Sequence, residues 1–197
     1  MSRPLESMRL ALRSLVLLAL LALPAARAVA QEMDVPVGTQ VSVLVKVIGF
    51  DRQLAVRAPT EIVIGIAFQG GSRASRVAKE EALRGFASAR AGINGVPIRV
   101  ETIDLDGERL ETALRRLTPT FLYVTPLRAE DIDAMVVATR AARVTTMTGV
   151  ARYVSRGLAI GVSLHDGRPR ILVNLESARL EGADLASELL KLATIIK

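Results

Sequence analysis

The chain has 197 residues, with a single histidine and no cysteine. The lack of cysteine excludes disulfide bonds, cysteine nucleophiles and zinc sites of the Cys/His kind. The formal net charge is +6, yet aromatic residues make up only 3% of the chain and opposite charges alternate, as in residues 76–86. This composition argues against nucleic-acid binding by a basic stripe or by base stacking.

The amino-terminal thirty residues have the layout of a secretory signal peptide. Three arginines between positions 3 and 13 precede nine apolar residues, 15–23, and the small residues Ala28-Val29-Ala30. The alternative is a membrane anchor, but nine apolar residues are too few to cross about 30 Å of hydrocarbon. We therefore expect cleavage near Ala30 and a mature chain, residues 31–197, in the periplasm. Because residues 1–30 hold four arginines and one glutamate, the mature chain keeps 22 basic and 19 acidic residues, a net charge of +3.

Residues 35–54 form the first predicted element, a helix that is apolar on two sides. One stripe at helical spacing consists of Val37, Val41, Leu44, Val45 and Ile48. The second stripe consists of Val43, Val47, Phe50 and Leu54. A helix with two apolar sides must bury both, so we expect the second stripe to contact a partner protein or a second copy of the chain. The alternative is a strand, because valine favours extended structure.

From Pro59 onward, predicted strands and helices alternate. The strands are 61–68, 97–103, 120–125 and 143–148. The helices are one that begins within 70–75 and ends near 92, one at about 108–117, and one at 129–142. In the first of these helices we expect an inward face and an exposed charged face. The inward residues are Ala74, Val77, Ala78, Ala82, Phe86 and Ala89, and the exposed ones are Arg76, Glu80 and Arg84. Such alternation is typical of an α/β domain with a mostly parallel sheet and right-handed crossovers.

The last third of the chain departs from this alternation. Strands 157–164 and 169–175 are joined through Asp166-Gly167, a pair that supplies the positive φ angles of a tight hairpin turn. A closing helix with the stripe Leu185, Leu189, Leu192 and Ile196 follows. We therefore predict one α/β domain over residues 31–197. It has three layers and a mostly parallel sheet, extended by an antiparallel carboxy-terminal hairpin and covered by a carboxy-terminal helix.

The sequence offers few candidates for catalysis. The only histidine, His165, stands beside the predicted hairpin turn. Nothing else in the sequence completes a nucleophile–base arrangement around it. An uncharacterised hydrolase is therefore a hypothesis that depends on His165 alone, and a solvated turn histidine is the alternative. We predict no enzyme activity, no cofactor and no metal.

Two stretches at strand ends are candidates for binding a small ligand or anion. Residues 70–75, GGSRAS, lie between a strand and a helix start, where backbone amides can hold an anion. Residues 101–108, ETIDLDGE, follow the next strand, where open α/β sheets bind ligands. The candidate residues are Ser72, Arg73, Arg76, Asp104 and Asp106. The alternatives are structural, since Ser72 suits a helix N-cap and the aspartates suit turns.

The order of several short motifs resembles the YfiR-like family of exported bacterial proteins. The resemblance is concentrated in the closing forty residues: the glycine-led hairpin 157–175, then Asn174-Leu175, Ala178-Arg179, and SELLKLA at 187–193. Upstream, the apolar first helix is followed in the expected order by the strands EIVIGIAF, VPIRV and FLYVTP. The resemblance covers about residues 36–196.

The resemblance implies a periplasmic α/β domain without a catalytic centre. Family members restrain a membrane-bound diguanylate cyclase and tend to dimerise, and release of the cyclase raises cyclic-di-GMP and favours biofilm. This chain departs from its relatives in having no cysteine, so disulfide-based redox control is not open to it. The leading hypothesis is a non-enzymatic periplasmic regulator whose partner is an inner-membrane signalling protein. The alternative is a periplasmic receptor for a small ligand or anion.

Overall fold

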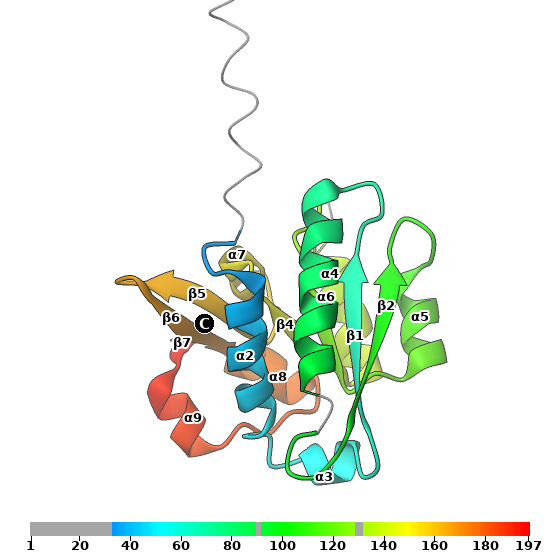
Figure 1. The fold of residues 1–197 in the computed structure, drawn as a ribbon. Coiled ribbons are helices and arrows are strands. Elements are labelled where there is room, and N and C mark those ends of the chain that lie inside the picture. The colour runs from blue at the N-terminus through cyan, green and yellow to red at the C-terminus, as the bar shows by residue number, and fades with distance from the viewer. Residues whose placement is uncertain (1–32, 90–91, 129–131) are drawn as a thin grey trace, which may run out of the picture. The chain divides into compact units, whose positions relative to one another are not determined.

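A computed structural model of the chain describes residues 33–89, 92–128 and 132–197, which all belong to one compact unit. The predicted signal peptide, residues 1–30, lies outside the described residues. Figure 1 shows the described elements as a sheet with helices packed against it.

The sheet has seven strands in the order β2-β1-β3-β4-β5-β6-β7. The strands are β1 (Ile62–Phe68), β2 (Ile98–Asp104), β3 (Phe121–Val124), β4 (Thr145–Thr148), β5 (Ile160–His165), β6 (Arg168–Asn174) and β7 (Thr194–Ile196). Strands β1 to β5 are parallel, β5 and β6 form an antiparallel hairpin, and β7 pairs parallel to β6. At the hairpin turn, Asp166 and Gly167 have φ angles of 49° and 71°. The predicted turn and antiparallel hairpin are therefore confirmed.

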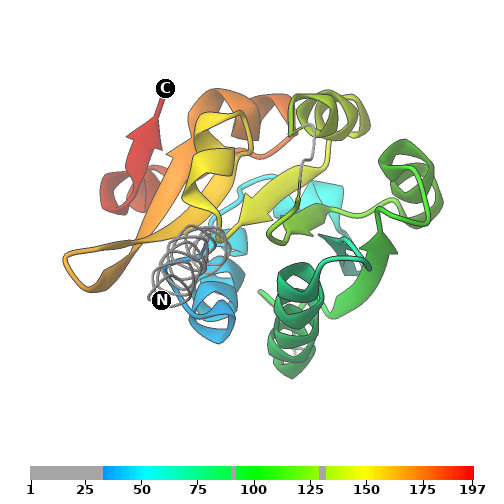
Figure 2. The same cartoon turned by 90° about the horizontal axis from the view of Figure 1, so that it is seen from above.

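Helices cover both faces of the sheet. They are α2 (Val37–Ile48), α3 (Leu54–Arg57), α4 (Arg73–Ser88), α5 (Leu110–Leu117), α6 (Ile132–Ala142), α7 (Ala151–Ser155), α8 (Leu175–Leu180) and α9 (Ser187–Leu192). Helices α2 and α4 pack on one face, and α5, α6 and α7 on the other, as Figure 2 shows from above. Two apolar clusters fill the spaces between these layers. The predicted α/β fold with a mostly parallel sheet is confirmed.

Helix α2 confirms the helical interpretation of the first element over the strand alternative. Its buried face contains a polar residue, Gln40, that anchors the helix to the sheet. The Tyr123 hydroxyl of β3 donates a hydrogen bond of 2.7 Å to Gln40 Oε1, and Gln40 Nε2 donates one of 2.6 Å to the Val35 carbonyl. Burial raises the pKa of Tyr123, so the hydroxyl remains a donor. A side chain at Gly149 would collide with the Gln40 amide, so this contact requires glycine there.

Two predictions about helix faces are wrong. Val77 is 50% exposed, because the buried stripe of α4 runs through Ser75, Ala78, Ala82 and Phe86 instead. The predicted closing helix is divided: α8 ends at Leu180, and Gly182, with a φ of 93°, turns the chain before α9 begins. Leu192 is consequently 65% exposed, and Ile196 lies in β7. Only Leu185 and Leu189 of the predicted stripe are buried in the core.

Candidate functional site

The predicted ligand residues lie together at the carboxyl ends of β1 and β2, next to the point between β1 and β3 where the strand order reverses. Open α/β sheets usually bind ligands at such a reversal. Ser72 is buried and caps α4, where its Oγ accepts a bond of 3.5 Å from the Ser75 backbone N–H. Arg73 and Arg76 are exposed on the first turn of the same helix. Ser72, Arg73 and Arg76 thus lie together at the start of α4, and their role in ligand binding stays a prediction.

The backbone amides of this loop are already bonded to carboxylates of the chain itself. The Gly70 N–H donates a hydrogen bond of 2.9 Å to Asp104 Oδ1, and the Gly71 N–H donates one of 2.6 Å to Asp106 Oδ2. The Arg76 guanidinium donates to the Gly70 carbonyl. The two aspartates thus occupy the positions that a bound anion would take, and they fix the β1–α4 loop to the end of β2.

The crevice between β1 and β3 is crossed by further side chains. Gln69 Nε2 donates a bond of 3.2 Å to the Arg128 carbonyl, and the Arg128 N–H donates one of 2.6 Å to Gln69 Oε1. In the buried layer, Ser75 Oγ lies 2.6 Å from Thr125 Oγ1. Gln69, Thr125 and Arg128 were not predicted from the sequence, because only the fold brings the β3–α6 loop to the β1–α4 loop. These contacts join the two loops across the crevice.

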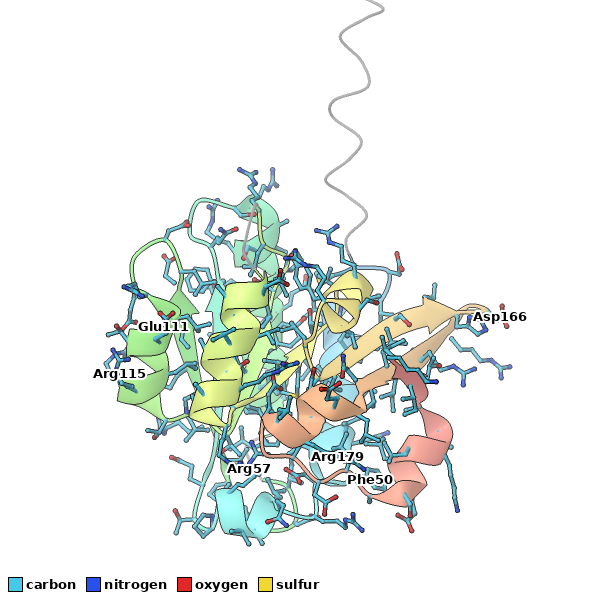
Figure 3. All side chains as sticks on the ribbon, turned by 180° about the vertical axis from the view of Figure 1, so that it is seen from behind. Phe50, Arg57, Glu111, Arg115, Asp166 and Arg179 are labelled. Carbon is cyan, nitrogen blue, oxygen red and sulfur yellow. The ribbon has the colours of Figure 1, made fainter. Side chains whose placement is uncertain are left out.

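The predicted partner stripe is mostly core. Val47 and Leu54 are only 1% and 4% exposed, and Val43 is partly buried against the same cluster. The reason is that α2 ends at Ile48, so Leu54 belongs to α3 and both sides of α2 are covered within the chain. Phe50 alone remains at the surface, with 37% exposure (Figure 3). Its carbonyl accepts a bond of 2.9 Å from the Ala186 N–H just before α9.

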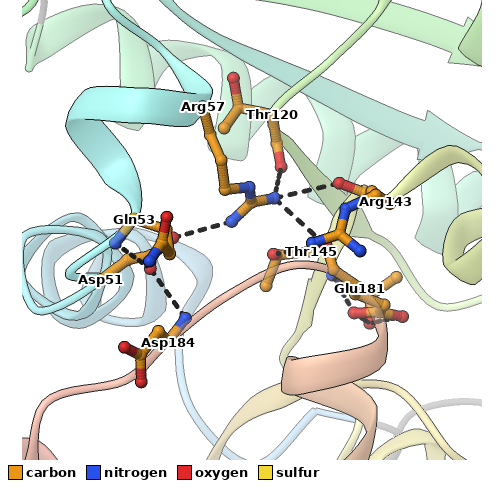
Figure 4. Close-up of polar contacts among 9 residues, drawn as sticks. Asp51, Gln53, Arg57, Thr120, Arg143, Thr145, Glu181 and Asp184 are labelled. Carbon is orange, nitrogen blue, oxygen red and sulfur yellow. Dashed lines mark hydrogen bonds and ion pairs between the residues drawn. The ribbon is translucent and has the colours of Figure 1, made fainter.

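A buried polar cluster joins the start of the domain to its end (Figure 4). Asp51 Oδ1 accepts hydrogen bonds from the backbone N–H groups of Gln53 at 3.0 Å and Asp184 at 2.9 Å. Asp51 Oδ2 forms an ion pair of 2.7 Å with Arg57 Nη1. Arg57 Nη2 donates to the carbonyl oxygens of Thr120, Arg143 and Glu181 at 2.9, 3.2 and 3.4 Å. Arg57 thus connects α3 to the amino ends of β3 and β4 and to the segment after α8.

Burial and pairing have opposite effects on the Arg57 guanidinium. Desolvation lowers its pKa, while the Asp51 carboxylate acts in the opposite direction. The guanidinium also lies 5.3 Å from the centre of the Phe121 ring, a cation–π contact. All of these contacts are internal, so the cluster's first role is to hold the fold together.

Glu181, next to this cluster, is a buried carboxyl group. Its Oε2 accepts a bond of 2.7 Å from the Thr146 N–H. Its Oε1 lies 3.0 Å from both Thr139 Oγ1 and Thr146 Oγ1. Burial raises the pKa of Glu181 to about 7, although these bonds and the nearby Arg140 charge lower it. No local sequence signal marks Glu181, because α6 and β4 supply its surroundings.

A cavity of about 850 Å³ lies at the last turns of α5 and α6, at the opposite end of the sheet from the predicted ligand residues. Its buried apolar residues are Leu114, Pro119, Ala138 and Val144. Its charged residues are Arg57, Glu111, Arg115 and Arg143, of which Figure 3 labels the first three. The volume falls in the range of roughly 300–1,000 Å³ that is usual for small-molecule sites.

The single histidine lies in the open. His165 Nε2 is 3.5 Å from Asp166 Oδ2 at the hairpin turn, and both side chains are exposed. Among the residues that the structure describes, no three His, Asp or Glu side chains form a metal-binding group. Nor does any helix in the described ranges have the length and apolar character needed to span a membrane.

Comparison with known proteins gives one family and several similar folds. A family model described as YfiR/HmsC-like matches residues 66–194. No curated protein matches the sequence. A conserved domain protein from Vibrio cholerae has 15% identity and a TM-score of 0.57, and the alignment covers 82% of this chain and 60% of that one.

Two further solved structures share the fold. An ABC domain from Streptococcus pneumonia, in complex with L-Trp, has 13% identity and a TM-score of 0.56, with 82% of this chain and 62% of that one covered. A substrate binding protein with adhesive properties from Clostridium difficile, in its ligand-free open form, has 17% identity and a TM-score of 0.50, with 74% and 57% covered. The chain therefore spans about three fifths of the length of each structure, and at these identities the likeness concerns the fold alone.

Proposed function

The chain belongs to the YfiR/HmsC-like family, whose members are periplasmic regulators of diguanylate cyclase, and from this membership we propose that it is a periplasmic, non-enzymatic regulator. It binds an inner-membrane signalling protein and restrains a diguanylate cyclase, so that its release raises cyclic-di-GMP and favours biofilm. The family match over residues 66–194 carries this proposal, since it extends from β1 into β7. Residues 1–30 serve as the signal peptide, and residues 31–197 form the exported domain.

The use of acidic residues in the fold supports a binding role over a catalytic one. Asp104 and Asp106 hold the β1–α4 loop, and Asp51 holds Arg57 and the segment before α9. Each of these carboxylates is engaged in joining parts of the chain. The alternative function is a receptor for a small ligand or anion.

We place the contact with the membrane partner at Phe50. Its ring is an exposed aromatic group on a short turn that is hydrogen-bonded to the segment before α9. Exposed aromatic side chains on rigid segments are frequent anchors of protein–protein contacts. Val47 and Leu54 support this surface from beneath, because they pack in the core under the turn.

The proposal predicts that the full chain, crosslinked in cells and captured from solubilised inner membrane, recovers a membrane protein with a cytoplasmic cyclase domain, identified by mass spectrometry. Changing Phe50→Glu is expected to reduce this recovery about tenfold and to raise cellular cyclic-di-GMP, because a charged group replaces an apolar anchor.

Val56→Glu is the matched control. It introduces the same glutamate six residues away, at a side chain on α3 that is 76% exposed. It should leave recovery unchanged. Equal loss in both variants would refute the role of Phe50. Recovery of no membrane protein by the unaltered chain would refute the proposed function itself, whereas a different membrane signalling protein would change the pathway.

A further inference from the structure

The cavity beside α5 and α6 combines a buried apolar lining with an excess of positive charge. Leu114 is in the last turns of α5, Ala138 is in α6, and Val144 precedes β4; all three are buried. An apolar group placed here would be removed from water on several sides at once, which is the main source of binding energy for small molecules. The cavity is therefore shaped for an apolar body.

The net charge of the residues that line the cavity determines which charged group a bound ligand can carry. Arg57 is neutralised by Asp51 and engaged with three backbone carbonyls. Glu111 lies 3.5 Å from Arg109, and the charges of Arg109 and Arg115 both act on its carboxylate. Arg115 and Arg143 then leave the lining with a net positive charge.

The partial negative charge at the carboxyl ends of α5 and α6 favours arginine there, but it does not neutralise the charges of Arg115 and Arg143. The carboxyl end of a helix carries a partial negative charge that attracts cations. At α5 the Leu114 carbonyl is already bonded to the Thr118 N–H, and beyond α6 the Arg143 carbonyl is bonded to Arg57. Half an elementary charge per helix end is also smaller than one guanidinium charge. The surplus positive charge is thus available to an anion from solution.

We propose that this cavity binds a monocarboxylate with an apolar body, of the fatty-acid or aryl-acid type, whose carboxylate is attracted by the charges of Arg115 and Arg143 at its lining. Arginine and carboxylate match in geometry and form charge-assisted, two-point hydrogen bonds. An ammonium group on the same apolar body would be repelled by the two guanidinium groups. This inference is independent of the proposed regulatory function.

Two probes with the same tail and opposite heads test the proposal: decanoate and decylamine, titrated calorimetrically into the full chain below their micelle concentrations. We expect saturable 1:1 binding of decanoate and at least about tenfold weaker binding of decylamine. Changing Arg115→Gln and Arg143→Gln together should weaken decanoate about tenfold and leave decylamine no weaker than before. Arg84→Gln, on the exposed face of α4, is the control and should change neither affinity.

Ala141→Trp supplies a second, steric test. Ala141 lines the cavity but is exposed, so a larger side chain is tolerated by the fold and obstructs the opening. This variant should lose decanoate binding while its Tm without ligand stays unchanged. The proposal is overturned if decanoate does not bind, if decylamine binds equally well, or if the double arginine variant binds decanoate as the original chain does.

Discussion

Glu181 is a carboxyl group in a pocket that also suits its neutral form. Thr139 Oγ1 lies 3.0 Å from Glu181 Oε1 and equally 3.0 Å from the Met135 carbonyl. A hydroxyl has one hydrogen to donate. When Thr139 donates it to its own helix, Thr139 Oγ1 accepts a hydrogen bond from protonated Glu181. The neutral acid therefore satisfies the site, in agreement with the pKa of about 7 that burial gives it.

This site predicts how stability depends on pH. The pKa of Glu181 is about 7 in the folded protein and near 4.5 when unfolded, so the folded state holds more protons between these values. The free energy of unfolding should accordingly fall as pH rises through this window, by up to roughly 3 kcal/mol. The measurement is urea unfolding at about pH 5 and about pH 8, for the original chain and Glu181→Gln.

Glu181→Gln should flatten this dependence, because an amide does not titrate. The charged groups around the site are Arg140 on α6, Arg143 after it, and the Arg57–Asp51 pair. If the variant keeps the full slope, one of these other groups or a surface carboxylate is responsible instead.

At the scale of elements, α2 shows how a helix with two apolar sides can bury both of them within its own chain. Burial on both sides of a helix is expected when both are apolar, but the sequence does not say whether the covering surface is internal. Here the sheet covers one side, and α4 and the segment around α9 contribute to the same apolar cluster. Val47 and Leu54 are therefore core residues, and only Phe50 remains exposed to a partner.

Changing Val47→Asp should consequently unfold the domain. The net free energy of unfolding of a domain is typically only about 5–15 kcal/mol. Burying an unpaired carboxylate in this apolar cluster is expected to exceed that stability. Far-UV circular dichroism and a thermal melt should show loss of the cooperative transition. Ser42→Asp, on the exposed side of the same helix, is the control and should melt as the original chain does. If the Val47→Asp protein folds but no longer captures its partner, then the stripe that contains Val47 and Phe50 is a partner surface and not core.

The sequence predicts the alternating elements because strands 62–68 and 121–124 are continuous apolar runs and the Asp166-Gly167 turn has an unambiguous composition. It does not predict β7. Ile195 and Ile196 are good strand formers, yet Ile196 also continues the helical spacing of Leu185, Leu189 and Leu192. Residues 194–196 form a strand because they pair with β6, and the local sequence does not reveal that pairing.

In the candidate site, too, features set by neighbouring residues can be predicted from the sequence, whereas contacts between distant residues cannot. Ser72 is recognisable as an N-cap from its position before a helix. That Asp104 bonds to Gly70 depends on a contact between residues 34 positions apart, and the Gln69–Arg128 contact spans 59 positions. Both contacts follow from the strand order, so they emerge only with the fold.

At the scale of the whole molecule, Asp51 joins the first and last parts of the domain. It is buried and bonds to Arg57, to the Gln53 amide and to the Asp184 amide. Removing one partner of a buried ion pair leaves the other charge without compensation, at a cost of about 3–5 kcal/mol. Asp51→Ala should lower the free energy of unfolding by that amount, measured by urea denaturation.

The matched control is Asp184→Ala. The Asp184 carboxylate pairs with Arg52 at 2.6 Å, but both side chains are substantially exposed. Water and salt weaken such pairs, so this change should lower the free energy of unfolding much less than Asp51→Ala does. Equal effects of the two substitutions would show that Asp51 does not hold the domain together.

Asp51 and its backbone partner Asp184 are separated by 133 positions in the chain. A ribosome makes the chain from its amino end at about 5–20 residues per second, so this bond cannot form until Asp184 has been synthesised. Contacts of such long range are also slow to form, since a large loop must close first. A protein that is threaded across a membrane has to remain unfolded on the way. The proposed export of this chain would therefore benefit from a domain whose ends are joined by a contact of such long range.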